Sequence, residues 1–181
     1  THWTRKSFER VFDQTESDLD MKLVYDVAHN IAKVEKHKVD GEERKLVVHR
    51  KGATRAFPSN RAEIPSKYRD LGQPVLVPGS MGTSSWILLG KSNSMDLSFG
   101  STAHGAGRTM SRSKARRNFT EDNVKKSLND KGIFIKALTR DGVVEETPEA
   151  YKDVDSVVNV SHNLGIATKV AKLVPIGVIK G

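Results

Sequence analysis

Cysteine is absent from this sequence of 181 residues, which excludes disulfide bonds and thiolate metal ligands within it. Aromatic residues make up only 6%, too few to interleave with the charges as in surfaces that stack the bases of single-stranded RNA. Long apolar runs are also missing, so no segment is expected to cross a membrane. The 36% of hydrophobic and 29% of charged residues fit a modest core beneath a well-solvated surface.

Two further absences concern the N-terminal end. The sequence has no initiator methionine there, and residues 1–9 are polar, without the apolar core of a signal peptide. We therefore expect a fragment, a processed product or a trimmed chain. The length of 181 residues is that of one domain, and we expect residues 1–181 to form it.

Positive charge is in excess, because 30 Lys and Arg against 22 Asp and Glu give a formal net charge of +8. An excess of this size favours polyanions such as nucleic acids as partners. A membrane partner is not expected, since no apolar run exists to insert. The alternative interpretation is a soluble protein that is basic without binding any polyanion.

A long β-hairpin is predicted in the first third of the chain. Apolar residues alternate over residues 23–31 as in a strand, although a helix would tolerate part of the same pattern. The pair Asp40-Gly41 decides for the hairpin, since it is a strong turn signal between residues 30–39 and 43–50. A hairpin without a bulge makes two pairs of neighbours: Val34 with Val47, and His29 with Gly52.

The rest of the chain mixes helices and strands without strict β-α-β alternation, which indicates the α+β class with small mixed sheets and peripheral helices. Loops are expected over residues 51–70, 78–82 and 98–107. The expected helices are 1–15, a basic helix 108–117, a helix 120–131 with Thr120 as its N-cap, and 153–164. The expected strands are 74–77, 84–89, 133–138 and a final strand 170–179 that Pro175 interrupts.

The segment around His104 is the most informative for chemistry, because a single histidine stands among small residues and precedes Arg108. Glycines such as Gly105 and Gly107 let backbone N–H groups approach a ligand, and a following helix N-terminus favours phosphate. A neutral imidazole is a competent nucleophile toward a phosphoryl group near pH 7. The alternative is a flexible loop with a surface histidine.

Three other patterns do not indicate a function when each is taken alone. His29 could ligate a metal, yet a lone strand histidine is more often structural. The turn that begins at Pro78, with the hydroxyl of Ser85 beside it, could form an anion-binding nest or merely connect two strands. Arg108 and Arg112, four positions apart, would share a helix face and could hold a nucleic-acid phosphate, or could simply be solvated.

Taken in order, these segments resemble successive motifs of the RtcB family, the GTP- and manganese-dependent RNA ligases of tRNA splicing and RNA repair. The matching segments are residues 27–33 (VAHNIAK), 49–58 (HRKGATRAFP), 72–76 (GQPVL), 78–83 (PGSMGT), 104–108 (HGAGR) and the closing 175–181 (PIGVIKG). The resemblance therefore runs over the whole chain and identifies it as the C-terminal portion of such a ligase.

The resemblance implies a role for each candidate residue. His104 would be guanylylated, His29 would bind manganese, and Arg108 and Arg112 would face the RNA end. The guanine nucleotide would contact a larger set: His29, Asn30, Pro78, Gly79, Ser80, Met81, Ser85, His104, Gly105, Ala106, Gly107, Tyr151 and Lys180. The implied reaction joins RNA 2′,3′-cyclic phosphate or 3′-phosphate ends to 5′-hydroxyl ends through a GMP–histidine intermediate.

The resemblance also implies partners and a departure from the family. GTP and manganese would be required, the RNA would be tRNA halves or broken RNA ends, archease could activate the enzyme, and the location would be cytoplasmic. Family members are longer and carry Asp, Cys and further His ligands for manganese in an N-terminal portion, whereas this chain supplies only His29. We therefore expect the chain alone to be inactive. The rivals are a metal-dependent phosphoesterase and a non-enzymatic basic RNA-binding domain.

Overall fold

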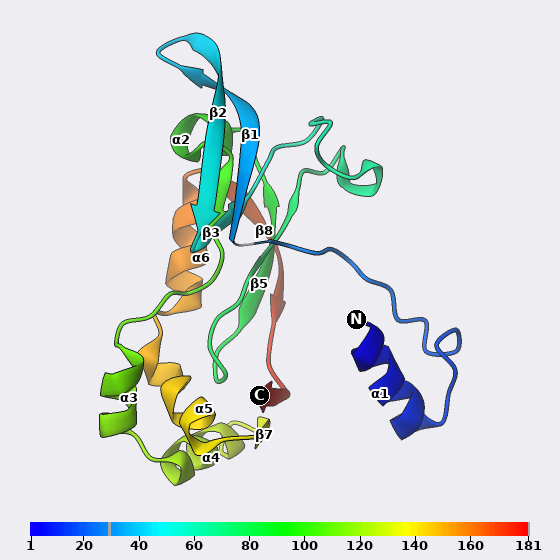
Figure 1. Ribbon diagram of the computed structural model, residues 1–181, viewed down its shortest axis with the longest axis vertical. Helices are drawn as coiled ribbons and strands as arrows, with labels where there is room; N and C mark the ends of the chain where they lie inside the picture. The colour runs from blue at the N-terminus through cyan, green and yellow to red at the C-terminus, as the bar shows by residue number, and fades with distance from the viewer. Residues whose placement is uncertain (29, 181) are drawn as a thin grey trace.

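The computed structural model describes residues 1–28 and 30–180, and Figure 1 shows how their helices and strands are arranged. The elements in chain order are α1 (His2–Phe12), β1 (Asn30–Val39), β2 (Glu42–Lys51), β3 (Ala53–Arg55), η1 (Ser66–Tyr68), β4 (Pro74–Val77), β5 (Ser85–Gly90), α2 (Asn93–Ser98), β6 (Ser101–Ala103), α3 (Arg112–Asn118), α4 (Glu121–Asn129), β7 (Phe134–Ala137), α5 (Arg140–Glu145), η2 (Pro148–Ala150), α6 (Val154–Asn163), β8 (Ala167–Leu173) and β9 (Gly177–Lys180). Helices surround several small sheets, which confirms the α+β class.

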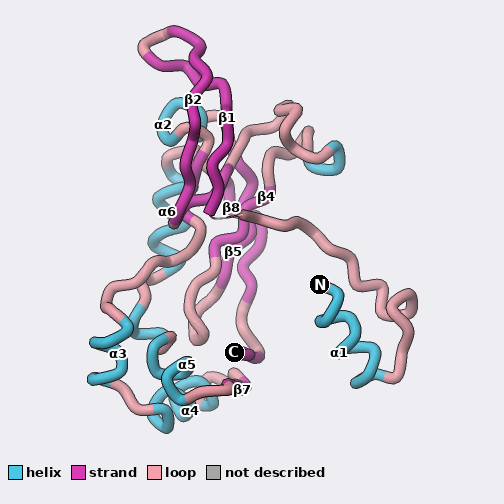
Figure 2. The backbone as a smooth tube through the Cα atoms, in the orientation of Figure 1, coloured by secondary structure: helices cyan, strands magenta, loops and turns pink. Residues whose placement is uncertain are grey.

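An antiparallel sheet in the order β4-β5-β8 forms the centre of the molecule. Helix α6 covers one face of it (Figures 1 and 2). Alternate strand residues such as Val75 and Leu88 point toward this helix and are 1% and 0% exposed. Val154 and Val158 complete the core from the helix, because residues four apart lie on one helix face. Asp153 caps the helix, accepting hydrogen bonds from the N–H groups of its first turn.

A second, smaller core lies below the first, between α4, α5 and the parallel pair β7–β9. Its buried members are Met81, Val124, Leu128, Ile133 and Val143. The predicted N-cap Thr120 is confirmed, because its hydroxyl accepts from the Asn123 N–H at 3.4 Å. Helix α5 was not predicted; its short polar sequence gave no apolar period to recognise.

The β1–β2 hairpin rises from the top of the molecule (Figure 1), and its register confirms the prediction that Val34 faces Val47. The prediction that the first strand begins at Leu23 is wrong, since residues 22–28 form no regular structure. Leu23 and Val24 are 57% and 59% exposed. Alternation suggested a strand, but none of the described strands pairs with residues 22–28. The expected proximity of His29 to Gly52 lies outside the described residues.

Two other expectations need correction. The segment 51–70 is mostly loop, but it contains β3, which pairs with β6 in the loop expected at 98–107. The final strand is two strands in different sheets, because Pro175 separates β8 from β9. Isoleucine side chains are ordinarily buried, yet Ile176 and Ile179 are 85% and 87% exposed, since among the described residues β7 is the one strand that pairs with β9.

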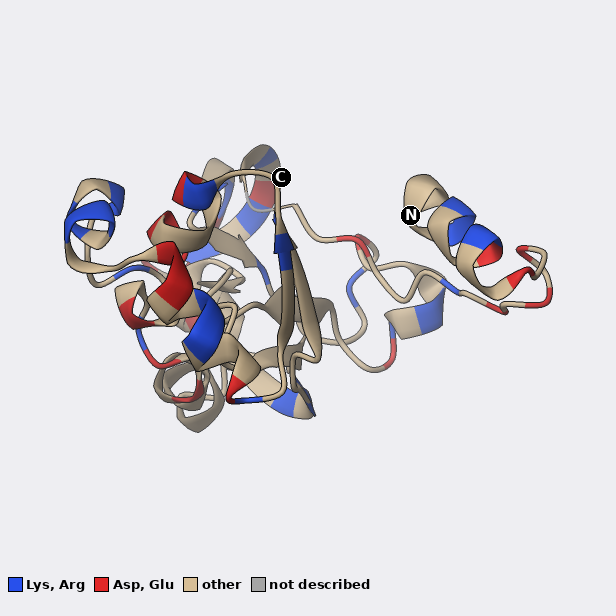
Figure 3. Cartoon of the chain, turned by 90° about the horizontal axis from the view of Figure 1, so that it is seen from below, with Lys and Arg blue, Asp and Glu red and all other residues tan. Residues whose placement is uncertain are grey.

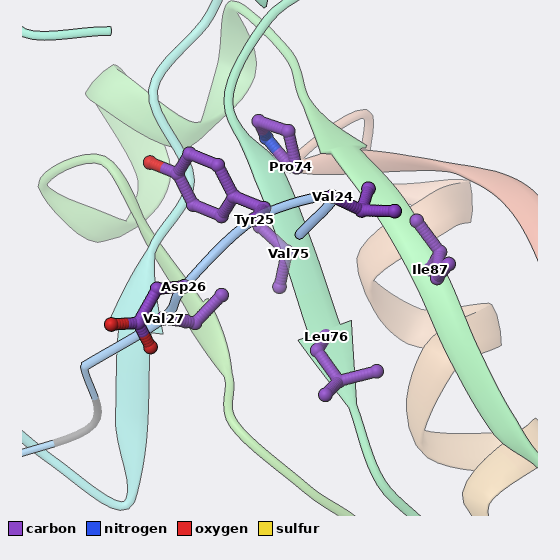
Figure 4. Close-up of a pocket in the computed structure, with 8 residues that line it drawn as sticks. All are labelled: Val24, Tyr25, Asp26, Val27, Pro74, Val75, Leu76 and Ile87. Carbon is purple, nitrogen blue, oxygen red and sulfur yellow. The ribbon is translucent and has the colours of Figure 1, made fainter. Parts of the chain in front are cut away.

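The first 28 residues lie along the outside of the molecule. Helix α1, with none of its residues buried, stands apart from the rest (Figure 3). The segment that follows it runs across the central sheet, where Val24 and Tyr25 lie over Leu76 and Ile87 and line a cavity of about 280 Å³ (Figure 4). Among the described residues, no helix combines the length and the apolar character that crossing a bilayer requires.

Candidate nucleotide and RNA site

Two loops meet at the end of the central sheet, the turn after β4 and the glycine-rich segment after β6. The Ala106 N–H donates a hydrogen bond to the Pro78 carbonyl at 2.9 Å, which joins them. A Cβ on Gly105 would lie 3.3 Å from the Pro78 oxygen, so glycine permits this close approach. Two segments that the sequence analysis singled out separately thus form one structure.

The turn that begins at Pro78 is closed by its own hydroxyl groups. The Ser80 N–H donates to Thr83 Oγ1 at 2.7 Å, and the Gly79 N–H donates to Ser85 Oγ at 3.4 Å. A Cβ on Gly79 would lie 2.1 Å from the Ser84 carbonyl oxygen, so only glycine fits here. The N–H groups that a phosphate would use are therefore engaged by hydroxyls, which a phosphate oxygen would have to replace.

Two residues implied as nucleotide contacts carry side chains that belong to the cores. Met81 is 6% exposed and packs in the lower core, and Ala106 is 4% exposed and packs in the upper one. Only their backbone atoms can serve a ligand. The two side chains anchor the loops, because burying apolar side chains on both sides of the junction fixes both loops in position.

His104 is half-buried and follows β6 directly. Strand β6 pairs with β3, so that Ala103 lies opposite Ala53. A Cβ on Gly52 would be 3.8 Å from His104 Nε2, which places the imidazole ring against the backbone of Gly52. Asn30 lies nearby in register, opposite Lys51, whereas His29 lies outside the described residues.

Arg108 does not lie on a helix, contrary to the prediction, because Ser111 caps α3 and the helix begins only at Arg112. The two arginines therefore do not share a helix face. Arg108 instead donates to the Tyr151 hydroxyl at 3.0 Å and to the Glu145 carbonyl at 2.6 Å. Its guanidinium also lies 4.9 Å from the centre of the Tyr151 ring.

Glu146 brings together the candidate residues that the sequence could not connect. Its carboxylate accepts from the Tyr151 hydroxyl and lies 3.4 Å from Arg108 Nη1 and 3.6 Å from Lys180 Nζ. Arg112 Nη2 lies 3.8 Å from the same carboxylate. Four residues implied as nucleotide or RNA contacts thus surround one acidic side chain.

The surroundings of Glu146 determine its charge. Burial opposes ionisation, but the Tyr151 hydrogen bond and the charges of Lys180, Arg108 and Arg112 outweigh it, so the pKa of Glu146 lies below its ordinary value. Burial and the neighbouring carboxylate raise the pKa of Tyr151. At neutral pH Glu146 is therefore ionised, and Tyr151 keeps the proton that it donates.

Helix α3 is basic, as predicted, but acidic side chains of α5 face it. Arg112 Nε lies 3.4 Å from Glu145, and Arg116 pairs with Glu145 and lies 3.8 Å from Asp141. Figure 3 shows Lys and Arg interleaved with Asp and Glu over the lower helices. Arg112 remains 64% exposed at its side chain, so its guanidinium is accessible from solvent although it is paired.

Three acidic residues of the site, Glu145, Glu146 and Asp155, were not predicted from the sequence. Asp155 accepts hydrogen bonds from Ser84 and from Trp86 Nε1, at 3.2 and 2.7 Å, and so positions the start of β5. The sequence feature that could have pointed to an acidic site is the adjacent pair Glu145-Glu146, because the chain has an excess of positive charge. Their partners lie far away in the sequence, so the pattern alone could not reveal the cluster.

The described residues do not contain a complete manganese site. Nowhere in residues 1–28 and 30–180 do three His, Cys, Asp or Glu side chains gather as a metal site requires. His29 lies outside this part of the chain. The described residues therefore do not fit a manganese ion by themselves.

Comparison with known proteins places the site in a family. The family model described as "tRNA-splicing ligase RtcB" matches residues 1–181. Proteins of that name from Aeropyrum pernix and Thermococcus kodakarensis are 58% and 55% identical over the entire chain, which covers 37% and 38% of their own lengths. The same name belongs to a Pyrococcus abyssi protein, 55% identical, of which the chain covers 20%. The chain spans less than half the length of each of these relatives. Since the family model matches all of its residues, the chain belongs to the RtcB family.

Proposed function

We propose that this chain, as one domain over residues 1–181, acts as the C-terminal portion of an RNA ligase. The ligase would join RNA 3′-phosphate or 2′,3′-cyclic phosphate ends to 5′-hydroxyl ends. The observation that carries the proposal is the junction of the His104 loop with the Pro78 turn, beside the cationic cluster around Glu146. The junction combines a nucleophile, hydroxyl and amide donors and fixed positive charge, as nucleotidyl transfer requires.

His104 would act first, as the nucleophile. A ring nitrogen attacks the α-phosphorus of GTP, a nitrogen–phosphorus bond forms, and the bond to pyrophosphate breaks. Once water has opened a cyclic end, an oxygen of the RNA 3′-phosphate attacks the phosphorus of this GMP; a phosphoanhydride forms and the nitrogen–phosphorus bond to His104 breaks. Finally the 5′-hydroxyl attacks this activated phosphate, loses its proton and expels GMP, which leaves a phosphodiester.

The other residues would bind and orient the reactants. Ser80 and Ser85 hydroxyls would contact the phosphates, with backbone groups of the two loops beside them. Tyr151 and Lys180 would lie at the guanine, and Arg108 and Arg112 at the RNA end. The N-terminal portion of the enzyme would supply the remaining manganese ligands, archease would be an activating partner, and the location would be cytoplasmic.

The test uses the full-length protein with GTP, manganese and two RNA strands, one ending in 3′-phosphate and the other beginning with 5′-hydroxyl. Joined RNA is expected with GTP and not with ATP, and none with the His104→Ala protein. The matched control is His162→Ala, which removes an exposed histidine from α6, on a different element, and should retain activity. RNA binding without joining would favour the basic RNA-binding domain instead.

A further inference from the structure

The two faces of the β1–β2 hairpin differ in character. One face carries the buried side chains of Glu35, His37 and Arg50 and packs on the body of the protein. The opposite face presents Val34 and Val47, which are 70% and 61% exposed. We call this second face the outer strip; its members are Asn30, Ala32, Val34, Lys36, Lys38, Glu43, Lys45, Val47, His49 and Lys51.

The outer strip carries positive charge that the protein does not neutralise. It holds four lysines and one glutamate, Glu43, which pairs with Lys36 at 2.8 Å. Lys38 and Lys45 form no ion pair with any residue that the structure describes. Lys45 also stands directly opposite Lys36 in the register. Like charges that face each other across two strands destabilise the pairing, so folding alone does not explain the arrangement.

A hollow of about 390 Å³ borders the strip between the hairpin and residues 60–63. Acidic side chains line it as well as basic ones, but they are occupied. Glu63 pairs with Arg61 at 2.6 Å, Glu43 pairs with Lys36, and Glu35 with the buried Arg50. The unpaired charge at this hollow is that of Lys45.

The strip leads toward the candidate nucleophile. Its lower end is Lys51, opposite Asn30, and the next residue, Gly52, faces the His104 ring, which would lie 3.8 Å from a Cβ at this position. Lys45 precedes Lys51 by six positions, about 20 Å along a strand at about 3.3 Å per residue. A polyanion whose end reaches His104 could therefore follow the strip and meet Lys45 and Lys38 several nucleotides from that end.

We propose that the outer strip of the hairpin binds the RNA strand whose end is at His104, with Lys38 and Lys45 on its phosphates. The proposal rests on the ligase function proposed above. Charge complementarity selects RNA as the occupant, because a protein surface packed on Val34 and Val47 would enclose these unpaired lysines and incur their desolvation. The exposed valines then lie beneath the riboses and bases between the phosphate contacts.

The experiment measures RNA binding by the full-length protein, with Lys38→Ala and Lys45→Ala combined. A long 3′-phosphorylated RNA should bind about fivefold more weakly per lost contact at 0.1 M salt. The slope of log affinity against log salt should fall by about 1.4, since each contact to a single strand contributes about 0.7. A dinucleotide ending in 3′-phosphate, too short to reach Lys45, should bind as before.

Two variants serve as controls. Lys125→Ala combined with Lys126→Ala removes the same charge from α4, at the far end of the molecule (Figure 1), and should leave the salt slope unchanged. Lys38→Arg combined with Lys45→Arg keeps the charge and should bind like the wild type. Labelling of the wild type by GTP, measured without RNA, reports separately on the proposed ligase function.

Unchanged affinity and salt slope in the alanine variant, in protein that still accepts GMP, would overturn the proposal for the hairpin alone. If the alanine variant aggregates, Lys38→Gln combined with Lys45→Gln removes the same two charges with polar side chains and takes its place in the same measurement. A third outcome separates the two proposals. If the wild type accepts no GMP, but the alanine variant still binds RNA more weakly than the wild type, the ligase function is refuted and the strip remains an RNA-binding surface.

Discussion

Arg50 and Glu35 form a two-pronged ion pair on the inner, buried face of the hairpin, where they lie on different strands. Arg50 Nη1 and Nη2 donate to the two carboxylate oxygens at 2.8 and 2.7 Å, and the residues are 2% and 5% exposed. Arg50 also donates to Ser101 Oγ and to the Phe99 carbonyl, each at 2.8 Å. The pair thus connects the hairpin to β6, the strand that directly precedes His104.

Glu35→Gln is expected to destabilise the full-length protein by about 3–5 kcal/mol, because it leaves the buried charge of Arg50 without its partner. Denaturant unfolding measures the loss. Glu42→Gln is the matched control, since it breaks an exposed pair with Arg44 on the same hairpin and should cost less than about 1 kcal/mol. Equal effects of the two substitutions would contradict the importance of the buried pair.

The same substitution should change how stability depends on pH. Burial opposes ionisation of Glu35, but hydrogen bonds from Arg50 and His37 outweigh it and lower its pKa below the ordinary value of 4.5. A lowered pKa gives stability that is present above pH 4.5 and disappears as the pH falls through the folded-state value. Glu35→Gln should therefore flatten the acid side of the stability curve; an unchanged acid side would show that Glu35 does not contribute to it.

Lys180→Ala should slow nucleotidyl transfer and weaken the preference for GTP over ATP in the full-length protein. The reason is the position of the Lys180 ammonium, which lies 3.6 Å from Glu146. This ammonium would donate a hydrogen bond to guanine O6, whereas adenine carries an amino group at the same position. Leaving such a group unpaired costs about 1–3 kcal/mol, about tenfold to a hundredfold in selectivity. The measurement is the transfer rate from each nucleotide, with a melting curve. Lys136→Ala, on the partner strand β7, is the control.

Gly79→Ala should disrupt the turn that would hold the phosphates. The new Cβ would lie 2.1 Å from the Ser84 carbonyl oxygen, so the backbone must move, at a cost of about 1–3 kcal/mol. GMP transfer to the protein should fall sharply. Gly177→Ala is a suitable control, because the nearest atom to its Cβ, the Phe134 oxygen, is 3.6 Å away. Comparable loss in both variants would argue against a special role for the turn.

Residues 1–181 alone should bind manganese weakly and join no RNA. Affinity grows with the number and geometry of ligands, and the described residues offer no group of three. Titration calorimetry of the isolated chain measures this directly. Binding at micromolar concentration or tighter, lost in His29→Ala, would prove the expectation wrong.

Local signals in the sequence predicted local structure well. Asp40 and Gly41 both adopt positive φ in the hairpin turn, and Thr120 and Asp153 cap the helices that they were expected to begin. The start of the basic helix was predicted too early. Ser111 is a good N-cap residue, and it begins α3 after Arg108. Alternation before Asn30 indicated a strand that has no partner to pair with.

The connections within the site were beyond prediction from local patterns. Glu146 meets Arg108 and Lys180 only because the segment of Arg108 pairs with Tyr151 and β9 pairs with β7. The burial of Glu35 was equally hidden, since a charged strand residue ordinarily faces water. Candidate residues could be named from motifs, but their convergence required the fold.

The most direct test of the account is the identity of the residue that carries GMP. The full-length protein is incubated with manganese and GTP labelled at the α-phosphate, digested under alkaline conditions and analysed by mass spectrometry. The account predicts GMP bonded to a ring nitrogen of His104, with a label that is lost in acid and kept in alkali. A label that persists in the His104→Ala protein, or that maps to another residue, would contradict it.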